Sequence, residues 1–369
     1  MVTNERPFSP DDPVGEAFRD AVQAAITGFL DQRHDELAAI GPELDVPLQL
    51  AHLFTGGGKR LRPAFCYWGR VAAGGQPTDV EALVRASASL DLLHVSALMH
   101  DDVMDGSDTR RGVPAAHRQF QALHAERNGR SDGEAFGRAG AILLGDLLLV
   151  WSQQMIAESG LPLAELERGR PLLEAVRTEV TCGQFLDVVA QSAPVTATLE
   201  EALATANQVV EYKTNRYTVQ RPLQLGAAMG GADEQLVDQL ARFASPIGRA
   251  FQFRDDLLGI FGDQELTGKP AGDDLREGKR TVLVAHALAQ SPADAAAELD
   301  AMLGDPTLDA GQVERGRQII AASGAKEAVE RTIASSYQQA MEALAAAEVT
   351  DEGRTALTRL ADACVNRAF

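Results

Sequence analysis

Cysteines are few in this sequence and follow no pattern. The three cysteines, Cys66, Cys182 and Cys364, are widely spaced along 369 residues. They fit neither a disulfide framework nor the usual spacing of a zinc site, and such a set favours a reducing compartment. The first residues, MVTNERPFSPDDPVGEAF, are polar and contain proline, unlike a secretion signal. We therefore expect a cytoplasmic protein.

Long apolar runs and an excess of positive charge are also missing. The stretch AILLGDLLLVW is interrupted by Asp146 and is shorter than the roughly 20 residues that a membrane span needs. We therefore expect no integral membrane segment. The formal net charge is -19, which argues against nucleic acid as the main partner because phosphate backbones attract basic surfaces.

Alternating patterns typical of β-strands are scarce, whereas helical patterns are abundant. Apolar residues recur at intervals of three and four in segments such as VEALVRASASLDLLHVSALMHDDVMD and LLEAVRTEVTCGQFLDVVAQ, as buried helices require. Glycine and proline cluster between these segments, and no linker separates two cores. The sequence predicts an all-α fold, with a mobile segment at residues 1–15 and a single helical domain at residues 16–369.

Aspartates crowd the motif MHDDVMDGSDTRRG. Asp101 and Asp105 are four residues apart and share one face of a helix, with Asp102 on a neighbouring face. Carboxylates this close repel one another unless a cation lies between them. Mg²⁺ suits such a cluster, because it takes oxygen ligands and binds through carboxylates together with substrate phosphates. The alternative is an acidic helix end without function, although acids oppose the macrodipole there.

A second aspartate pair strengthens the metal interpretation. Asp255 and Asp256 stand near the end of another apolar helix, in FQFRDDLLGIFGD. Two carboxylate groups that face each other across a helical bundle can form a multi-metal site in its core.

Basic residues lie beside glycines in two further motifs. TGGGKRLRP contains Lys59, Arg60 and Arg62, and it is no phosphate-binding P-loop because Arg60 stands where that motif needs serine or threonine. Cations next to flexible backbone nevertheless suit phosphate. TGKPAGDDLREGKRT adds Lys269 and Lys279. Two phosphate-bearing substrates, one held through Mg²⁺ and one held directly by cations, would use both kinds of motif.

Several motifs of this chain resemble those of the trans-polyprenyl diphosphate synthases. In chain order, between about residues 50 and 285, they are GGGKRLRP, DDVMDGSDTRRG, GQFLD, KT, FQFRDDLLGIFGD and TGKPAGDD. The resemblance implies an isoprenoid synthase-type helical bundle around a deep central cavity, usually in a homodimer. It also implies condensation of isopentenyl diphosphate with an allylic diphosphate, with three Mg²⁺ ions in each active site. The ions and lysines would stabilise the departing diphosphate.

The resemblance assigns roles to individual residues. It implies that the metal ligands are Asp101, Asp105 and Asp255, supported in catalysis by Asp102 and Asp256. It implies that isopentenyl diphosphate is bound by Lys59, Arg62, His94 and Arg111. Contacts to the allylic substrate and its leaving group would come from Arg110, Lys213, Thr214, Gln252 and Lys269, and Lys213 and Lys269 would also act in catalysis. Gln184 and Asp187 match an element near the metal site.

The sequence departs from the family pattern at one notable position. Gly259 stands where many members carry a third aspartate in the second motif. In addition, Arg216 and Arg221 make the stretch KTNRYTVQRP more basic than expected, and the sequence provides no account of them.

Product length depends on the residues beneath the first aspartates. The family's shorter-product enzymes carry aromatic residues four or five positions before the first aspartate, where this chain has Ala97 and Ser96. Leu93 and Leu90 are the next bulky residues on that face, and each helical turn adds about 5.4 Å. Geranylgeranyl diphosphate, with twenty carbons, is therefore the expected product. Farnesyl and longer polyprenyl products stay open, because neighbouring helices can also form the floor.

Two other kinds of protein share parts of the pattern. A class I terpene cyclase handles a single diphosphate, has no use for Lys59, Arg62 and Arg111 together, and carries a different second metal motif from FRDDLLG. A non-catalytic prenyltransferase subunit usually lacks one aspartate motif, whereas this chain has both.

Overall fold

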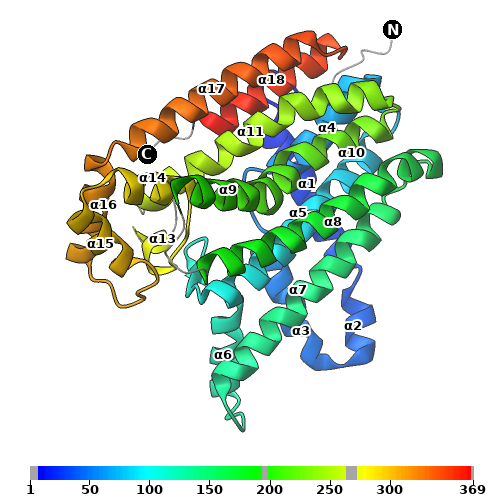
Figure 1. Ribbon diagram of the computed structural model, residues 1–369. Coiled ribbons are helices and arrows are strands. Elements are labelled where there is room, and N and C mark those ends of the chain that lie inside the picture. Colours follow the sequence, from blue (N-terminus) through cyan, green and yellow to red (C-terminus); the bar gives the residue numbers. More distant parts are fainter. Residues whose placement is uncertain (1–6, 193–197, 263–271, 367–369) are drawn as a thin grey trace.

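Helices form nearly all of the computed structural model, which describes residues 7–192, 198–262 and 272–366 (Figure 1). The first half contains α1 (Glu16–Asp31), α2 (His34–Ile40), the 3₁₀ turn η1 (Pro42–Leu44), α3 (Asp45–Thr55), α4 (Leu61–Gly74), α5 (Val80–Asp105), α6 (Ala116–Glu126) and α7 (Gly133–Ala157). The middle of the chain contains α8 (Leu163–Gln191), α9 (Leu199–Val209), the π-helix η2 (Val210–Gln220), α10 (Arg221–Met229) and α11 (Glu234–Phe261). The remainder contains α13 (Asp273–Arg276), α14 (Val282–Gln290), α15 (Ala293–Met302), α16 (Ala310–Ala322), α17 (Ala325–Ala346) and α18 (Asp351–Val365). The predicted all-α fold is confirmed.

Local sequence sets the ends of the two helices that carry the aspartate motifs. The side chain of Asp79 accepts a hydrogen bond from the backbone N–H of Ala82 at the start of α5, and Asp233 caps α11 in the same way. Gly106 ends α5 with φ 67°, a left-handed conformation that glycine adopts without steric cost. The first aspartate motif is therefore held at the C-terminal end of a long, capped helix.

Two large apolar clusters form the core, and α11 belongs to both. The first cluster contains Phe243 and Ile247 of α11 together with residues of α1, α4, α5, α7 and α10. The second contains Leu257 and Ile260 of α11 together with residues of α14 to α17; α14, α15 and α16 gather on the left in Figure 1. A small third cluster joins α5, α8 and η2 beneath the first aspartate motif. Because α11 takes part in both large clusters, the second aspartate motif has firm packing around it.

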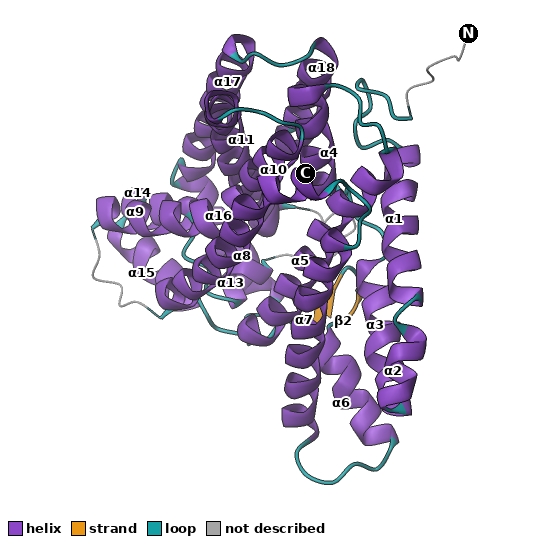
Figure 2. Ribbon diagram, turned by 90° about the vertical axis from the view of Figure 1, so that its right-hand side faces the viewer, coloured by secondary structure: helices purple, strands orange, loops and turns teal. Residues whose placement is uncertain are grey.

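A short hairpin follows α5. The strands β1 (Thr109–Arg110) and β2 (Val113–Pro114) pair antiparallel (Figure 2). Arg111 and Gly112 form its turn with φ values of 53° and 79°, as a tight two-residue turn requires. The sequence indicated no run of strands, and two-residue strands are too short to leave a periodic signal. This turn sets the directions of the two arginines in the first motif.

The N-terminal segment packs against the bundle over the part that the structure describes. Phe8 is only 9% exposed, and its ring meets those of Phe18 and Tyr67 edge to face, with centroids 5.1 and 5.2 Å away. Such pairs are favourable beyond the area that they bury. Phe8 is therefore packed against the bundle, and residues 1–6 lie outside the described residues.

Within the described ranges, α5 and α7 are long and apolar enough to cross a membrane by length and composition alone. In α5, 78% of the apolar window is buried inside the molecule, as befits a core helix. In α7 the buried share is 39%, so much of its apolar surface faces outward.

Candidate active site

A cavity of about 1050 Å³ extends between α5, α8, η2 and α11. Apolar side chains line part of it, including Ala97, Leu98, Val180 and Phe251. Its polar lining includes the predicted residues Lys59, Arg62, His94, Asp101, Arg110, Arg111, Lys213, Thr214, Gln252, Asp255 and Asp256. The cavity thus brings together residues from four separate motifs. The predicted residues that do not line it are Leu93, Ser96, Asp102 and Asp105, and Lys269 lies outside the described residues.

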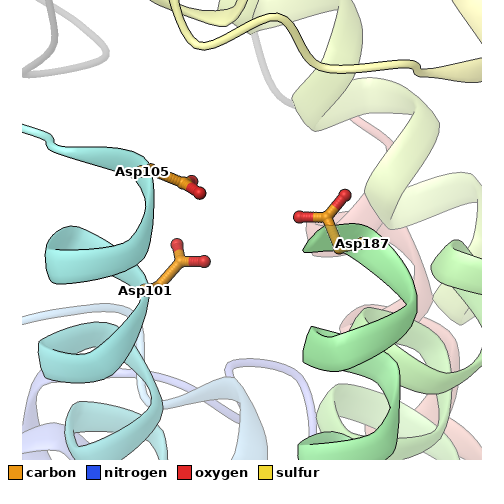
Figure 3. Close-up of side chains that lie close together, drawn as sticks. All are labelled: Asp101, Asp105 and Asp187. Carbon is orange, nitrogen blue, oxygen red and sulfur yellow. The ribbon is translucent and has the colours of Figure 1, made fainter. Parts of the chain in front are cut away.

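The first carboxylate cluster combines α5 with α8. Asp101 and Asp105 face Asp187 across the cavity (Figure 3), and one oxygen from each lies within 4.8 Å of the others. The Nζ of Lys213 lies 2.8 Å from Asp101 Oδ1 and 2.5 Å from Asp187 Oδ2. Gln184 donates a further hydrogen bond of 2.7 Å to Asp101 Oδ1. The lysine therefore offsets the mutual repulsion of these carboxylates.

Burial and charge act in opposite directions on this cluster. Burial alone would raise the pKa of Asp101, but Lys213 and Lys279 hold that pKa below its ordinary value. For Asp105, burial and the negative charge of Asp101 raise the pKa to about 6. Burial would lower the pKa of Lys213, yet Asp101 and Asp187 raise it. Asp101 is consequently ionised at neutral pH, and Asp105 is the weaker acid of the two.

The donor atoms of this cluster fit Mg²⁺. All three are carboxylate oxygens, the ligand type that Mg²⁺ prefers. Asp105 Oδ1 is buried and has no hydrogen-bond partner within the described residues, so a cation would satisfy an oxygen that is otherwise left alone. Asp101, Asp105 and Asp187 are the residues that would hold the ion. The sequence motif placed Asp187 near the expected metal site, and the structure places its carboxylate beside those of Asp101 and Asp105.

The second aspartate pair divides into an inner and an outer residue. Asp256 is 4% exposed and accepts a 2.7 Å hydrogen bond from Gln252 Nε2. Burial, together with the charges of Asp274 and Asp255, raises the pKa of Asp256 to about 8. Asp256 is therefore largely protonated at neutral pH.

Lys279 joins the two sides of the cavity. Its Nζ lies 2.5 Å from Glu277 Oε2, 3.3 Å from Asp274 Oδ1 and 3.9 Å from Asp105 Oδ2. The sequence motif contained this lysine without assigning it a role. The signal that could have found it is scarcity, because the chain has only five lysines and four of them are in the motifs, namely Lys59, Lys213, Lys269 and Lys279.

The basic side of the cavity contains stacked and hydrogen-bonded groups. Arg62 donates a 2.8 Å hydrogen bond to Thr218 Oγ1, and its guanidinium lies 4.1 Å from the ring centroid of Tyr217. The hydroxyl of Tyr217 in turn hydrogen-bonds His94 Nδ1. Burial and the charge of Arg62 lower the pKa of His94, so its imidazole is neutral. These contacts fix the direction of Arg62 toward the cavity.

The glycine motif forms a loop that two arginines hold in place. Gly57 and Gly58 have φ values of 70° and 95°, which only glycine adopts readily. Arg111 donates to the carbonyl oxygens of Phe54 and Gly56, each at 3.0 Å. Arg60, which the sequence grouped with the phosphate-binding cations, is 5% exposed.

Arg60 turns away from the cavity. It pairs with buried Asp91 at 2.7 Å and donates to the carbonyl of Thr55 at 2.8 Å. The pair anchors the loop that carries Lys59, because breaking a buried ion pair leaves a charge without compensation.

Asp102 also acts through an arginine. Its side chain is fully buried, and its two oxygens accept hydrogen bonds from Arg110 Nε at 2.9 and 3.2 Å. Arg110 lies 3.9 Å from Asp101 Oδ2. Asp102 therefore positions Arg110, whereas Asp101 lines the cavity and Asp105 points toward Asp187.

The π-helix η2 supplies Lys213, Thr214 and Tyr217 to the cavity, in agreement with the frequent occurrence of π-helical turns at functional sites. Gly183 lets α8 approach this helix, since a Cβ at that position would lie 2.3 Å from the backbone nitrogen of Lys213. Thr214 Oγ1 donates a 2.6 Å hydrogen bond to Gln252 Oε1 on α11.

The two unexplained arginines have a structural role in holding η2. Glu179 on α8 accepts hydrogen bonds from Arg216 at 2.7 Å and from Arg221 at 2.6 and 2.8 Å. Arg216 also donates to Glu211 at 2.7 Å. These partners account for the basic character of this stretch.

The isoprenoid synthases have this architecture. It is an all-helical bundle in which two helices with aspartate motifs face each other across a cavity, beside a glycine loop with basic residues. Residues 46–320 match the model of the polyprenyl synthetase family, and the chain belongs to this family. It is 30% identical to a geranylfarnesyl diphosphate synthase from Aeropyrum pernix, covering 86% of this chain and 92% of that protein. It is 33% identical to a nonaprenyl diphosphate synthase from Mycobacterium tuberculosis, covering 86% and 85%.

A solved structure with a similar fold is the geranylgeranyl pyrophosphate synthase from Corynebacterium glutamicum, in complex with isoprenyl diphosphate and magnesium. It is 38% identical, with a TM-score of 0.91 over 98% of this chain and 100% of that chain. The predicted family is thereby confirmed, and the chain is a prenyltransferase of the polyprenyl diphosphate synthase type. The family uses isopentenyl and allylic diphosphates, and the product lengths of its members differ.

Proposed function

We propose that this protein is a cytoplasmic, Mg²⁺-dependent synthase that extends allylic diphosphates with isopentenyl diphosphate and releases geranylgeranyl diphosphate. The observation that carries the proposal is a single cavity in which two aspartate helices, a basic loop and an apolar lining meet. The buried free thiol of Cys66 is in keeping with a reducing compartment.

Each group of residues has a defined task in this reaction. Lys59, Arg62 and Arg111 bind the diphosphate of isopentenyl diphosphate, and neutral His94 adds no competing charge. Lys213 and Lys279, with Arg110, face the allylic diphosphate and stabilise negative charge as it leaves. Mg²⁺, three ions in our proposal, supplies further positive charge to that leaving group when bound at the aspartates.

The apolar part of the cavity supports a twenty-carbon product. Ala97 lines the cavity one turn before Asp101 and leaves room there. Below it, Leu93 packs with Val176, Val180 and Tyr217 in the small third cluster. An apolar lining also excludes the water that would quench a carbocation. Ser96 is buried without lining the cavity, so we assign the main influence on length to Ala97 and Leu93.

The test is to incubate the purified protein with Mg²⁺, labelled isopentenyl diphosphate and, separately, dimethylallyl, geranyl and farnesyl diphosphates. We expect a dominant twenty-carbon product by chromatography. Ala97→Phe should shorten the product to fifteen carbons or fewer, because a ring would fill about one helical turn of the cavity, whereas the control Ala97→Ser should leave length unchanged. A main product of thirty carbons would contradict the proposed floor, and folded protein that extends no primer would contradict the activity.

We also propose that the protein is a homodimer. Exposed apolar side chains gather on α7 and α8, including Leu143 at 63%, Val150 at 62% and Phe185 at 68% exposure. Exposed apolar surface can mark an interaction site, and a second copy of the same chain can cover such surface symmetrically.

Light scattering should give about twice the 39.3 kDa of one chain. Leu143→Glu with Val150→Glu should shift the protein toward the monomer, because each charge would be buried at the interface. Gln153→Glu, an exposed position on the same helix, is the matched control. A wild-type mass of one chain would refute the dimer.

A further inference from the structure

The two aspartate helices differ in one respect. On α5, carboxylates occupy positions four residues apart, at Asp101 and Asp105, and both face the cavity region. On α11, Asp255 is followed four residues later by Gly259. Positions four apart share one helix face, so α11 presents one carboxylate where α5 presents two.

The space that a side chain of residue 259 would occupy is filled by a carboxylate from another element. A Cβ built on Gly259 would lie 1.9 Å from Oδ2 and 2.6 Å from Cγ of Asp274. Asp274 belongs to α13, fifteen residues further along the chain, yet it lines the same cavity as Gly259 and Asp255. Its carboxylate therefore begins where a side chain of residue 259 would begin.

Independent features of the neighbourhood indicate a cation ligand at this point. Asp256 Oδ2 lines the same cavity, is buried, and has no hydrogen-bond partner within the described residues. The cation that now compensates Asp274 is the ammonium of Lys279, 3.3 Å from Oδ1. A lysine that is shared among several carboxylates leaves charge for a divalent cation to neutralise.

We propose that Asp274 supplies the carboxylate that α11 lacks, so that the second Mg²⁺ site is built from Asp255 on α11 and Asp274 on α13. Gly259 is then required for space, because any side chain there would displace the Asp274 carboxylate. This inference rests on the proposed function and specifies the composition of its second metal site.

The inference is tested by calorimetric titration of Mg²⁺ into the full-length protein in the presence of inorganic pyrophosphate. Asp274→Ala should weaken Mg²⁺ binding 10- to 100-fold, the usual effect of losing a group that holds or orients a metal. Gly259→Ala should weaken it similarly without removing any charge. The double variant should be no weaker than Asp274→Ala, since both changes act on one carboxylate. The exchange variant, Gly259→Asp with Asp274→Ala, should recover most of the affinity.

Folding and general charge effects are controlled separately. Alanine in place of a helical glycine normally stabilises a helix by about 1 kcal/mol, so a Gly259→Ala protein with an undiminished melting temperature and weakened Mg²⁺ binding supports the displacement of Asp274. Asp238→Ala, an exposed acid on the same helix, should bind Mg²⁺ as the wild type does.

The outcomes separate this inference from the proposed function. Wild-type protein that binds no Mg²⁺ with pyrophosphate would overturn the proposed function and the inference together. Wild-type binding with an equal affinity in Asp274→Ala would overturn the inference alone. A folded exchange variant that recovers nothing would do the same.

Discussion

Asp101→Asn is expected to lower kcat about 10³-fold, at the upper end of the effect of removing one electrostatic stabiliser from an active site. The side chain keeps its size, but the cluster loses the carboxylate on which Lys213, Gln184 and Arg110 converge. Asparagine cannot provide the negative charge that a Mg²⁺ site requires. The measurement is single-turnover formation of product from farnesyl diphosphate and isopentenyl diphosphate at saturating Mg²⁺.

A matched control comes from the same motif. Asp108 is exposed and pairs with Arg118 at 2.7 Å, outside the cavity lining, so Asp108→Asn should retain nearly full turnover. Turnover of Asp101→Asn within tenfold of the wild type would contradict the central position that we assign to Asp101.

Lys213→Met is expected to have the largest effect on stability. The ammonium contacts Asp101 and Asp187 across two helices, and methionine would fill the space while removing the ammonium that both carboxylates contact. Removing one partner of such a buried network costs about 3 kcal/mol or more. We expect the free energy of unfolding, measured with urea and a chelator, to fall by about 3 kcal/mol.

The same variant should respond to metal in a characteristic way. Mg²⁺ with pyrophosphate should restore part of the lost stability, because a ligand that binds only the folded state stabilises it and replaces the missing positive charge. Turnover should still fall about 10²-fold, since the departing diphosphate loses a cation. Lys326→Met, on α17 outside the cavity lining, is the control. Unchanged stability in the chelator would show that Lys213 does not offset the carboxylates.

Relatives of this chain with similar identity make products of different lengths, such as geranylfarnesyl and nonaprenyl diphosphates. In our proposal the aspartates and cations serve the chemistry that these enzymes share, so they cannot distinguish the products. In our proposal, product length depends on how apolar side chains from α5, α8 and η2 meet below Ala97. A single sequence shows which residues are small, but the packing partners of Leu93 come from segments about 80 and 120 residues away.

At the charged end of the cavity, too, the sequence could not predict which side chains from distant segments would pair. Asp102 and Asp101 are neighbours in one motif, yet Asp102 is buried against Arg110 while Asp101 faces Lys213. Arg60 and Lys59 are neighbours as well, yet Arg60 pairs with Asp91. In both cases the local residue types are the same, and only the surrounding elements decide which side chain is buried.

The sequence by itself determined the all-α fold, the two aspartate helices and the family, because helical periodicity and short motifs are local properties. The four-residue spacing of Asp101 and Asp105 placed both on one face before any packing was known. Only the tertiary structure decided that Asp187 completes their cluster, that Lys279 joins its two sides, and that Asp274 occupies the space left at Gly259. The physical reason is that charge compensation and excluded volume act through space between segments far apart in the chain.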